Sequence, residues 1–126
     1  MRYLIDTHVA LWVLTGEPLS DKVKKILDDV TAEIYVSIVS AWEIAIKISA
    51  GKLKYTGGVK AFLEDIKLNE FKLLDITESH IVLVEGLEYH HRDPFDRLLI
   101  ASAKTEGMTL LTADENIHKY DVLSMW

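Results

Sequence analysis

The sequence predicts an α/β fold, a three-layer α/β/α sandwich with a central parallel sheet. Short apolar, β-branched runs of strand length alternate with segments in which apolar residues recur every three or four positions. Strands that are separated by helices pair in parallel and are covered by helices on both faces. The chain has 126 residues and no repeat or linker, so we expect a single domain over residues 1–126.

In the first half of the chain, apolar runs and capping residues mark the elements. Ser20 precedes apolar residues at helical spacing and caps a helix, and Glu33–Ile38 is β-branched, as strands often are. Ser37 or Ser40 caps the next helix, which ends before Gly51. The expected elements are a strand over Tyr3–Asp6, a helix over Val9–Leu14, a helix from Ser20 to Val30, a strand over Glu33–Ile38, a helix to Ser49 and a helix through Val59 and Ile66.

In the second half, Asp93-Pro94 marks the clearest helix start, because Asp is a preferred cap and Pro is favoured in the first turn. We therefore interpret Asp93 mainly as a structural cap. Gly107 ends that helix, and Thr77 caps an earlier one. The expected elements are a strand over Phe71–Ile76, a helix from Thr77 through Val84, a helix from Asp93 to Gly107, a strand over Met108–Thr112 and a last strand over Val122–Met125.

The composition is acidic, with 14 Lys and Arg against 20 Asp and Glu, a net charge of −6 and a pI near 5.3. This balance disfavours a broad basic surface for nucleic acid but permits chemistry on nucleic acid at a small site. The absence of cysteine excludes disulfides and thiolate zinc sites, and a cytoplasmic location is the default expectation. Thr7–Gly16, the longest uncharged run, is too short to span a bilayer, and Asp6 comes too early for a secretory signal.

Four acidic side chains fall near predicted strand ends or helix starts, where open parallel sheets bind ligands. Together they would repel one another strongly unless a cation lay among them. Oxygen ligands suit Mg²⁺ or Mn²⁺, which can activate water against a phosphodiester. We name these residues the acidic quartet: Asp6, Glu43, Asp96 and Asp114.

Each member of the quartet also has a structural interpretation. Asp6 could cap the next helix, and Asp114 could serve a turn. Glu43 could pair with Lys47 four residues later. Asp96 could interact with the dipole of its helix. The sequence alone leaves these alternatives open.

The segments that carry the quartet resemble PIN-domain proteins, specifically the VapC toxins of bacterial and archaeal toxin–antitoxin pairs. Their order and spacing fit that family over essentially the whole chain. Ile117 stands where an aromatic residue is frequent, which we interpret as a packing substitution. The matching segments are Leu4–His8 with Leu11-Trp12, Ser40–Lys47 with Gly51–Leu53, His91–Ala101 and Leu111–Asp114.

The resemblance implies a PIN-like fold and an endoribonuclease that depends on Mg²⁺ or Mn²⁺. The quartet matches the family's acidic residues, which hold the metal and activate water, and Thr112 matches a supporting hydroxyl. Asp93 belongs to an Asp-Pro-x-Asp variant, and its contact with the metal stays open. The resemblance further implies RNA products with a 5′-phosphate, a homodimer or higher oligomer, and a cognate antitoxin protein that blocks the site.

Histidines and basic residues surround the quartet in the sequence. His8 follows Asp6 as in calcineurin-like phosphoesterases, but the later Gly-Asp and Gly-Asn-His segments are missing, so we interpret His8 as a supporting residue. His90 and His91 are expected near the site, either contacting phosphate or solvated. An RNA-binding rim is the functional interpretation of the basic residues, and a scattered solvated surface is the alternative. The candidates are Lys47, Lys52, Lys54, Arg92 and Arg97.

Partner surfaces are the least constrained part of the sequence. A helical hairpin between Ser20 and Ser49 is expected to expose aliphatic surface for antitoxin or dimer contacts. The three tryptophans are interpreted as core or interface residues. The alternative function is a catalytically silent PIN-like module that binds protein or RNA, which the presence of the whole quartet disfavours. A structure-specific DNA nuclease on the same fold would need extra segments for its substrate.

Overall fold

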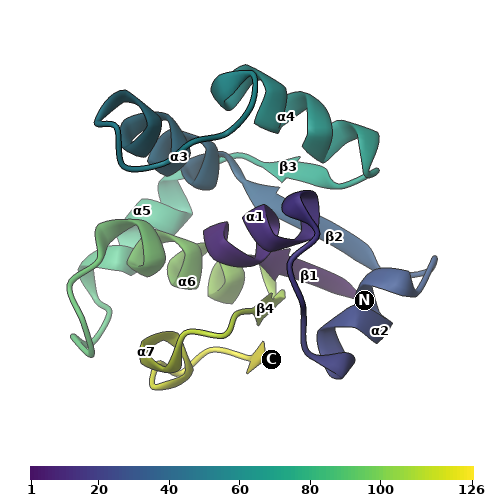
Figure 1. Cartoon of the computed structure of the whole chain (residues 1–126). Helices are drawn as coiled ribbons and strands as arrows, with labels where there is room; N and C mark the ends of the chain where they lie inside the picture. The colour runs from purple at the N-terminus through teal and green to yellow at the C-terminus, as the bar shows by residue number, and fades with distance from the viewer.

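The computed structural model describes residues 1–126, and its centre is a parallel five-stranded sheet (Figure 1). The strand order is β3-β2-β1-β4-β5, and every neighbouring pair is parallel. In the central strand, Ile5 lies opposite Val36 on one side and Leu111 on the other. The strands are β1 (Arg2–Ile5), β2 (Glu33–Ser37), β3 (Lys72–Leu74), β4 (Thr109–Leu111) and β5 (Ser124–Met125).

The helices begin where the capping residues of the sequence predict. The side chains of Ser20, Thr77 and Asp93 each accept a backbone hydrogen bond at a helix start. Ser37 caps the helix after β2, whereas Ser40 lies inside that helix. The helices are α1 (Thr7–Thr15), α2 (Asp21–Asp28), α3 (Ile38–Ser49), α4 (Gly58–Leu68), α5 (Glu78–Glu85), α6 (Pro94–Glu106) and α7 (Glu115–His118).

Two apolar clusters cover the two faces of the sheet and confirm the three-layer arrangement. In β1, Ile5 belongs to a cluster with residues of α1, α2 and α4, whereas Leu4 belongs to a cluster with residues of α6 and α7. Adjacent strand residues point to opposite faces, so β1, β2, β3 and β4 each contribute to both clusters. The α/β/α sandwich predicted from the sequence is therefore confirmed.

Some details differ from the expectation. The helix after Ser20 ends at Asp28, and Val30 is 98% exposed beyond its end. The expected helical hairpin between Ser20 and Ser49 is wrong, because β2 separates α2 from α3 and α3 packs against α4, α1 and α6 instead (Figure 1). The short helix α7 was not expected. No helix has the length and apolar character needed to cross a membrane.

The topology changes direction beside β1. The chain passes from β1 to β2 and β3 on one side of the sheet, and β4 and β5 are added on the other side. Connections that leave in opposite directions open a crevice at the carboxyl ends of the strands, where ligands of open α/β sheets bind. The segments after β1 and β4, which carry Asp6 and Thr112, lie at this point.

Candidate active site

Asp6 occupies the position directly after β1, and its side chain has two partners. One oxygen, Oδ1, accepts a hydrogen bond from the Val9 amide at 2.8 Å and caps α1. The other oxygen, Oδ2, accepts a hydrogen bond from the Thr112 hydroxyl. Burial raises the pKa of Asp6; these hydrogen bonds oppose the effect, and the charge of Asp114 adds to it. The capping alternative is therefore confirmed, and it coexists with a contact to the segment after β4.

Thr112 connects Asp6 with the backbone of Asp114. The Thr112 side chain is fully buried, and its hydroxyl accepts a hydrogen bond from the Asp114 amide at 3.0 Å while it donates to Asp6. Asp114 itself caps α7, because its Oδ1 accepts from the Asn116 amide at 2.9 Å. Asp114 thus has a structural role, although as a helix cap and not in the turn that was expected. Its charge nevertheless raises the pKa of both Asp6 and Asp96, so it lies within electrostatic reach of the two.

Asp96 lies in the first turn of α6, and its Oδ2 is 3.0 Å from Nε2 of His91. Burial raises the pKa of Asp96 to about 6; the bond with His91 opposes this rise, while the charges of Asp93 and Asp114 add to it. Burial lowers the pKa of His91, but the net shift is upward, and the bond with Asp96 is the largest effect that raises it. Asp93 is a helix cap, as expected, and accepts from the Phe95 and Asp96 amides.

Glu43 lies on α3 and is only 3% exposed. Its Oε2 accepts a hydrogen bond from Lys47 at 2.6 Å, so the predicted pair four residues apart is present. Its Oε1 is buried and has no hydrogen-bond partner. An unpaired buried carboxylate oxygen is costly and indicates a ligand that the protein alone does not supply.

Contacts on both sides of Glu43 join α3 to the segments of the other acids. Ser40 accepts a hydrogen bond from the hydroxyl of Thr7, the residue after Asp6, at 2.9 Å. Trp42 packs edge-on against Phe95, the residue before Asp96, with ring centroids 5.2 Å apart. The structure thus brings the quartet segments to one edge of the sheet.

The residues of the quartet fit a hard divalent cation by their chemistry. They offer carboxylate oxygens only; burial raises the pKa of Asp6 and of Asp96, and one oxygen of Glu43 is buried without a partner. As the side chains are placed, however, no three acidic or histidine residues form a group that could hold a metal ion. Binding by the whole quartet therefore requires side-chain rotation, above all of Glu43, which is turned to Lys47.

The predicted basic rim is wrong for Arg97. This residue is 5% exposed and donates to the backbone carbonyls of Glu88 at 2.9 Å and Leu87 at 3.2 Å. It faces inward because α6 packs on the sheet, so it has a structural role. Lys47 is paired with Glu43. Lys52, Lys54 and Arg92 are the rim candidates that are exposed, and His8 and His90 are exposed as well.

Sequence reasoning missed Tyr120, which is 5% exposed and lies just after α7. Its hydroxyl is 2.9 Å from Nδ1 of His91, the same imidazole that contacts Asp96. The two residues are 29 positions apart, so no local pattern could have paired them.

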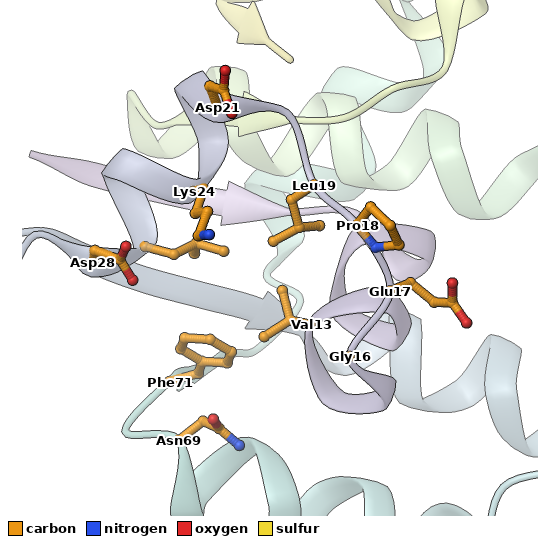
Figure 2. Close-up of a pocket in the computed structure, with 11 residues that line it drawn as sticks. Val13, Gly16, Glu17, Pro18, Leu19, Asp21, Lys24, Asp28, Asn69 and Phe71 are labelled. Atoms are coloured by element: carbon orange, nitrogen blue, oxygen red, sulfur yellow. The ribbon is translucent and has the colours of Figure 1, made fainter.

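A cavity lies away from the quartet, between the end of α1, α2 and the segment before β3 (Figure 2). Its volume is about 570 Å³. Val13, Leu19 and Phe71 surround the hollow, and Glu17 and Asp21 are at its margin (Figure 2). No member of the quartet lines it, so we regard it as a groove separate from the acidic site and name it the α1–α2 groove.

Known proteins with a similar sequence pattern and similar structures share this architecture. Residues 3–123 match the PIN domain family. A structure of VapBC2 from Rickettsia felis, bound to a DNA fragment from their promoter, aligns with TM-score 0.75 and 18% identity, covering 99% of this chain and 98% of the other. VapBC-1 from nontypeable Haemophilus influenzae aligns with TM-score 0.73 and 14% identity, covering 99% and 97%.

A third similar structure is FitAcB from Neisseria gonorrhoeae, with TM-score 0.61, 19% identity and coverage of 98% of this chain and 96% of the other. At these identities the likeness establishes the fold. No curated protein gives a significant match to the sequence. Because the family match spans nearly the whole chain and the fold agrees with it, this protein belongs to the PIN domain family.

Proposed function

We propose that this protein is a Mg²⁺- or Mn²⁺-dependent endoribonuclease and the toxin of a toxin–antitoxin pair. The observation that carries the proposal is the burial of Asp6 and the partial burial of Asp96 near the switch point of the sheet, each with a raised pKa and within reach of the charge of Asp114. Such an arrangement destabilises a protein that has no cation to bind. Membership of the PIN domain family and the similar VapBC structures support the same function.

The quartet would hold the cation, and Thr112 would fix the orientation of Asp6 toward it. When bound, the ion would polarise a water molecule and offset the charge that develops on the phosphate. Asp6 is held by hydrogen bonds on both of its oxygens, so it is oriented before any ligand arrives. Glu43 would have to exchange Lys47 for the ion. Hydrolysis would leave the 5′-phosphate on the downstream RNA fragment.

RNA would contact the exposed basic residues beside the site. Arg92, next to the cap of α6, and Lys52 and Lys54, after α3, are exposed and carry no ion pair. Arg97 is excluded from this surface because it is buried. Replacement of Arg92 by Ala should weaken RNA binding. It should also reduce the slope of log K against log salt by about one, the change expected for one lost phosphate contact. An unchanged slope would remove Arg92 from the RNA surface.

The partner would be an antitoxin protein that binds this protein in the cytoplasm and blocks its site. The α1–α2 groove suits an amphipathic segment of such a partner, because apolar Val13, Leu19 and Phe71 lie inside an edge that includes Glu17 and Asp21. An acidic edge favours a partner with basic residues. A homodimer could use the exposed row on α3 formed by Ile38, Trp42 and Ile46.

The decisive experiment incubates the purified protein with RNA in Mg²⁺ or Mn²⁺ and in excess EDTA. We expect cleavage only with the metal, and 5′-phosphate ends that a phosphate-dependent exonuclease degrades. Cleavage that persists in EDTA would contradict the metal mechanism. RNA binding without cleavage in any metal would instead favour the silent PIN-like module. The Glu43–Lys47 pair is a specific argument for that module, because Lys47 already supplies a positive charge beside Glu43.

The toxin assignment needs a separate test in cells. We expect that expression of the chain arrests growth, that the product of an adjacent small gene relieves the arrest and co-purifies with it, and that Asp6→Asn abolishes the arrest. Growth that is unaffected by a folded, cleavage-competent protein would contradict the toxin role while leaving the nuclease intact.

A further inference from the structure

We propose that Tyr120 is a positioning residue for Asp96: its hydroxyl holds His91 in the tautomer that donates a hydrogen bond to Asp96. The contacts between these residues are seen in the structure, and their consequence for metal binding rests on the function proposed above. Tyr120 follows the end of α7 and Asp96 lies in the first turn of α6, and the imidazole of His91 contacts both.

Three N–H groups converge on the hydroxyl oxygen of Tyr120. The guanidinium of Arg97 lies at 3.0 Å, and the backbone amides of His90 and His91 each lie at 3.3 Å. A hydroxyl oxygen has two lone pairs, so these donors fill its capacity to accept. The Tyr120 hydroxyl must therefore direct its own hydrogen outward. The nearest acceptor is Nδ1 of His91 at 2.9 Å; the carbonyl of His91 is farther away, at 3.2 Å.

This donor count determines the tautomer of the neutral imidazole. A neutral histidine that accepts at Nδ1 carries its hydrogen on Nε2. Nε2 of His91 is 3.0 Å from Oδ2 of Asp96, so the hydrogen points at that oxygen. Oδ1 of Asp96 accepts no hydrogen bond from the protein and is left for a cation. Outer hydrogen bonds of this kind fix the orientation of a metal-binding carboxylate.

Arg97 keeps Tyr120 in place. Besides the Tyr120 hydroxyl, its guanidinium binds the carbonyls of Glu88 and Leu87, and the Tyr89 ring lies against it at 4.0 Å. A buried guanidinium with this many fixed partners has little freedom to move. The connected contacts Arg97–Tyr120–His91–Asp96 thus link Asp96 to the segment before α6 and to Tyr120, which is distant in sequence.

The first test reads the tautomer directly in metal-free protein. Long-range ¹H–¹⁵N spectra, recorded as the pH is raised until the imidazole has lost its second proton, should assign the His91 hydrogen to Nε2 in the wild type. Tyr120→Phe should make the other tautomer detectable, because the Asp96 carboxylate is then the one remaining group that favours the hydrogen on Nε2. Tyr55→Phe is the matched control, because it removes a hydroxyl bonded to Asp65 in a different part of the molecule. A Tyr120→Phe spectrum identical to the wild type would overturn the proposal.

The second test measures Mn²⁺ affinity and cleavage in the same variants. Loss of an outer hydrogen bond weakens metal sites by about 10- to 100-fold, so Tyr120→Phe should raise the Kd for Mn²⁺ by about 10-fold. We expect kcat to fall at limiting Mn²⁺ and KM for RNA to stay constant, because Tyr120 is buried and offers no surface to RNA. A change in KM with unchanged Mn²⁺ affinity would contradict the positioning role.

A second variant covers the case in which Tyr120→Phe does not fold. His91→Gln retains a donor to Asp96 at a similar position but lacks the ring that Tyr120 orients, so it should keep more Mn²⁺ affinity than His91→Phe. Equal affinities in these two variants would overturn the proposal. Wild-type protein that binds no Mn²⁺ would contradict the proposed function, whereas wild-type binding that neither Tyr120 nor His91 influences would contradict the positioning alone.

Discussion

The two ends of the central sheet hold their acidic side chains in opposite ways. At the amino end, Glu33 at the start of β2 pairs with Lys72 at the start of β3 at 2.7 Å, and both side chains are exposed. The hydrogen bond and charge of Lys72 lower the pKa of Glu33. At the carboxyl end, Asp6 and Asp96 are desolvated, and burial raises their pKa. One sheet therefore carries a carboxylate whose pKa is lowered by an exposed ion pair and carboxylates whose pKa is raised by burial despite their hydrogen bonds.

The difference separates acids that stabilise the fold from acids that destabilise it. A carboxyl group whose pKa is lowered by folding contributes stability at neutral pH, and one whose pKa is raised reduces it. Asp6 and Asp96 belong to the second kind, so stability alone does not account for them. A bound cation would reverse the sign of their contribution. The comparison between the two ends can be tested by replacing acids at each.

The largest expected effect is on cleavage. Asp6→Asn or Asp96→Asn should lower kcat/KM for RNA by about 10²–10³-fold, because each removes charge that would stabilise the cation and the transition state. Glu33→Gln, at the amino end, should leave the rate unchanged. Initial rates on a labelled RNA at saturating Mg²⁺ measure both. An equal loss of kcat/KM in Glu33→Gln and Asp6→Asn would contradict the distinction between the two ends of the sheet.

The second effect concerns Arg97, the buried basic residue next to Asp96. Arg97 binds carbonyls and Tyr120 rather than the quartet, so Arg97→Ala should lower the free energy of unfolding by about 2–4 kcal/mol through the partners left unpaired. Arg92→Ala, at an exposed site, should change it by less than about 0.5 kcal/mol. Urea unfolding of both variants measures the difference. Comparable values would contradict the structural role of Arg97.

The third effect is stabilisation by metal. Mg²⁺ or Mn²⁺ at 100 times its Kd should raise the free energy of unfolding by about 2.7 kcal/mol, and EDTA should reverse the gain. Glu33→Gln should retain this stabilisation and Asp6→Asn should lose most of it. Thermal unfolding with and without the ion provides the measurement. A gain that survives in Asp6→Asn would place the ion elsewhere.

The smallest effect is the pH dependence of stability without metal. The pKa of Asp96 is raised to about 6, so between about pH 4 and 6 the native state binds more protons than the unfolded state, and stability falls as pH rises. Asp96→Asn should therefore stabilise the metal-free protein by about 1–2 kcal/mol at pH 7 and by nothing below about pH 4. Glu33 has a lowered pKa, so its contribution is lost as pH falls.

Denaturant unfolding between pH 3.5 and 8 distinguishes the two signs. For Glu33→Gln we expect a slight loss of stability at pH 7 and none in acid. Should Asp96→Asn destabilise the metal-free protein at pH 7, the buried carboxylate would be compensated after all, and the contrast between the ends of the sheet would fail.

The sequence by itself determined the features that depend on neighbours within a few positions. Ser20, Thr77 and Asp93 cap helices because each cap bonds to an amide two or three residues later. Alternating strand and helix patterns predicted the sandwich, and the placement of Asp6 after a strand and Asp96 in a first turn followed from the same patterns. These inferences succeeded because local geometry alone decides such positions.

Only the tertiary structure decided which side chains meet and which are buried. Asp6 is joined to Thr112 across 106 positions, and Tyr120 to His91 across 29. Arg97 and Arg92 belong to one charged segment, yet the packing of α6 buries the first and leaves the second in solvent. Partners of this kind are set by strand order and helix packing, which bring together residues that share no local signal. The sequence supplied the acids of the site, and the fold supplied their desolvation and their partners.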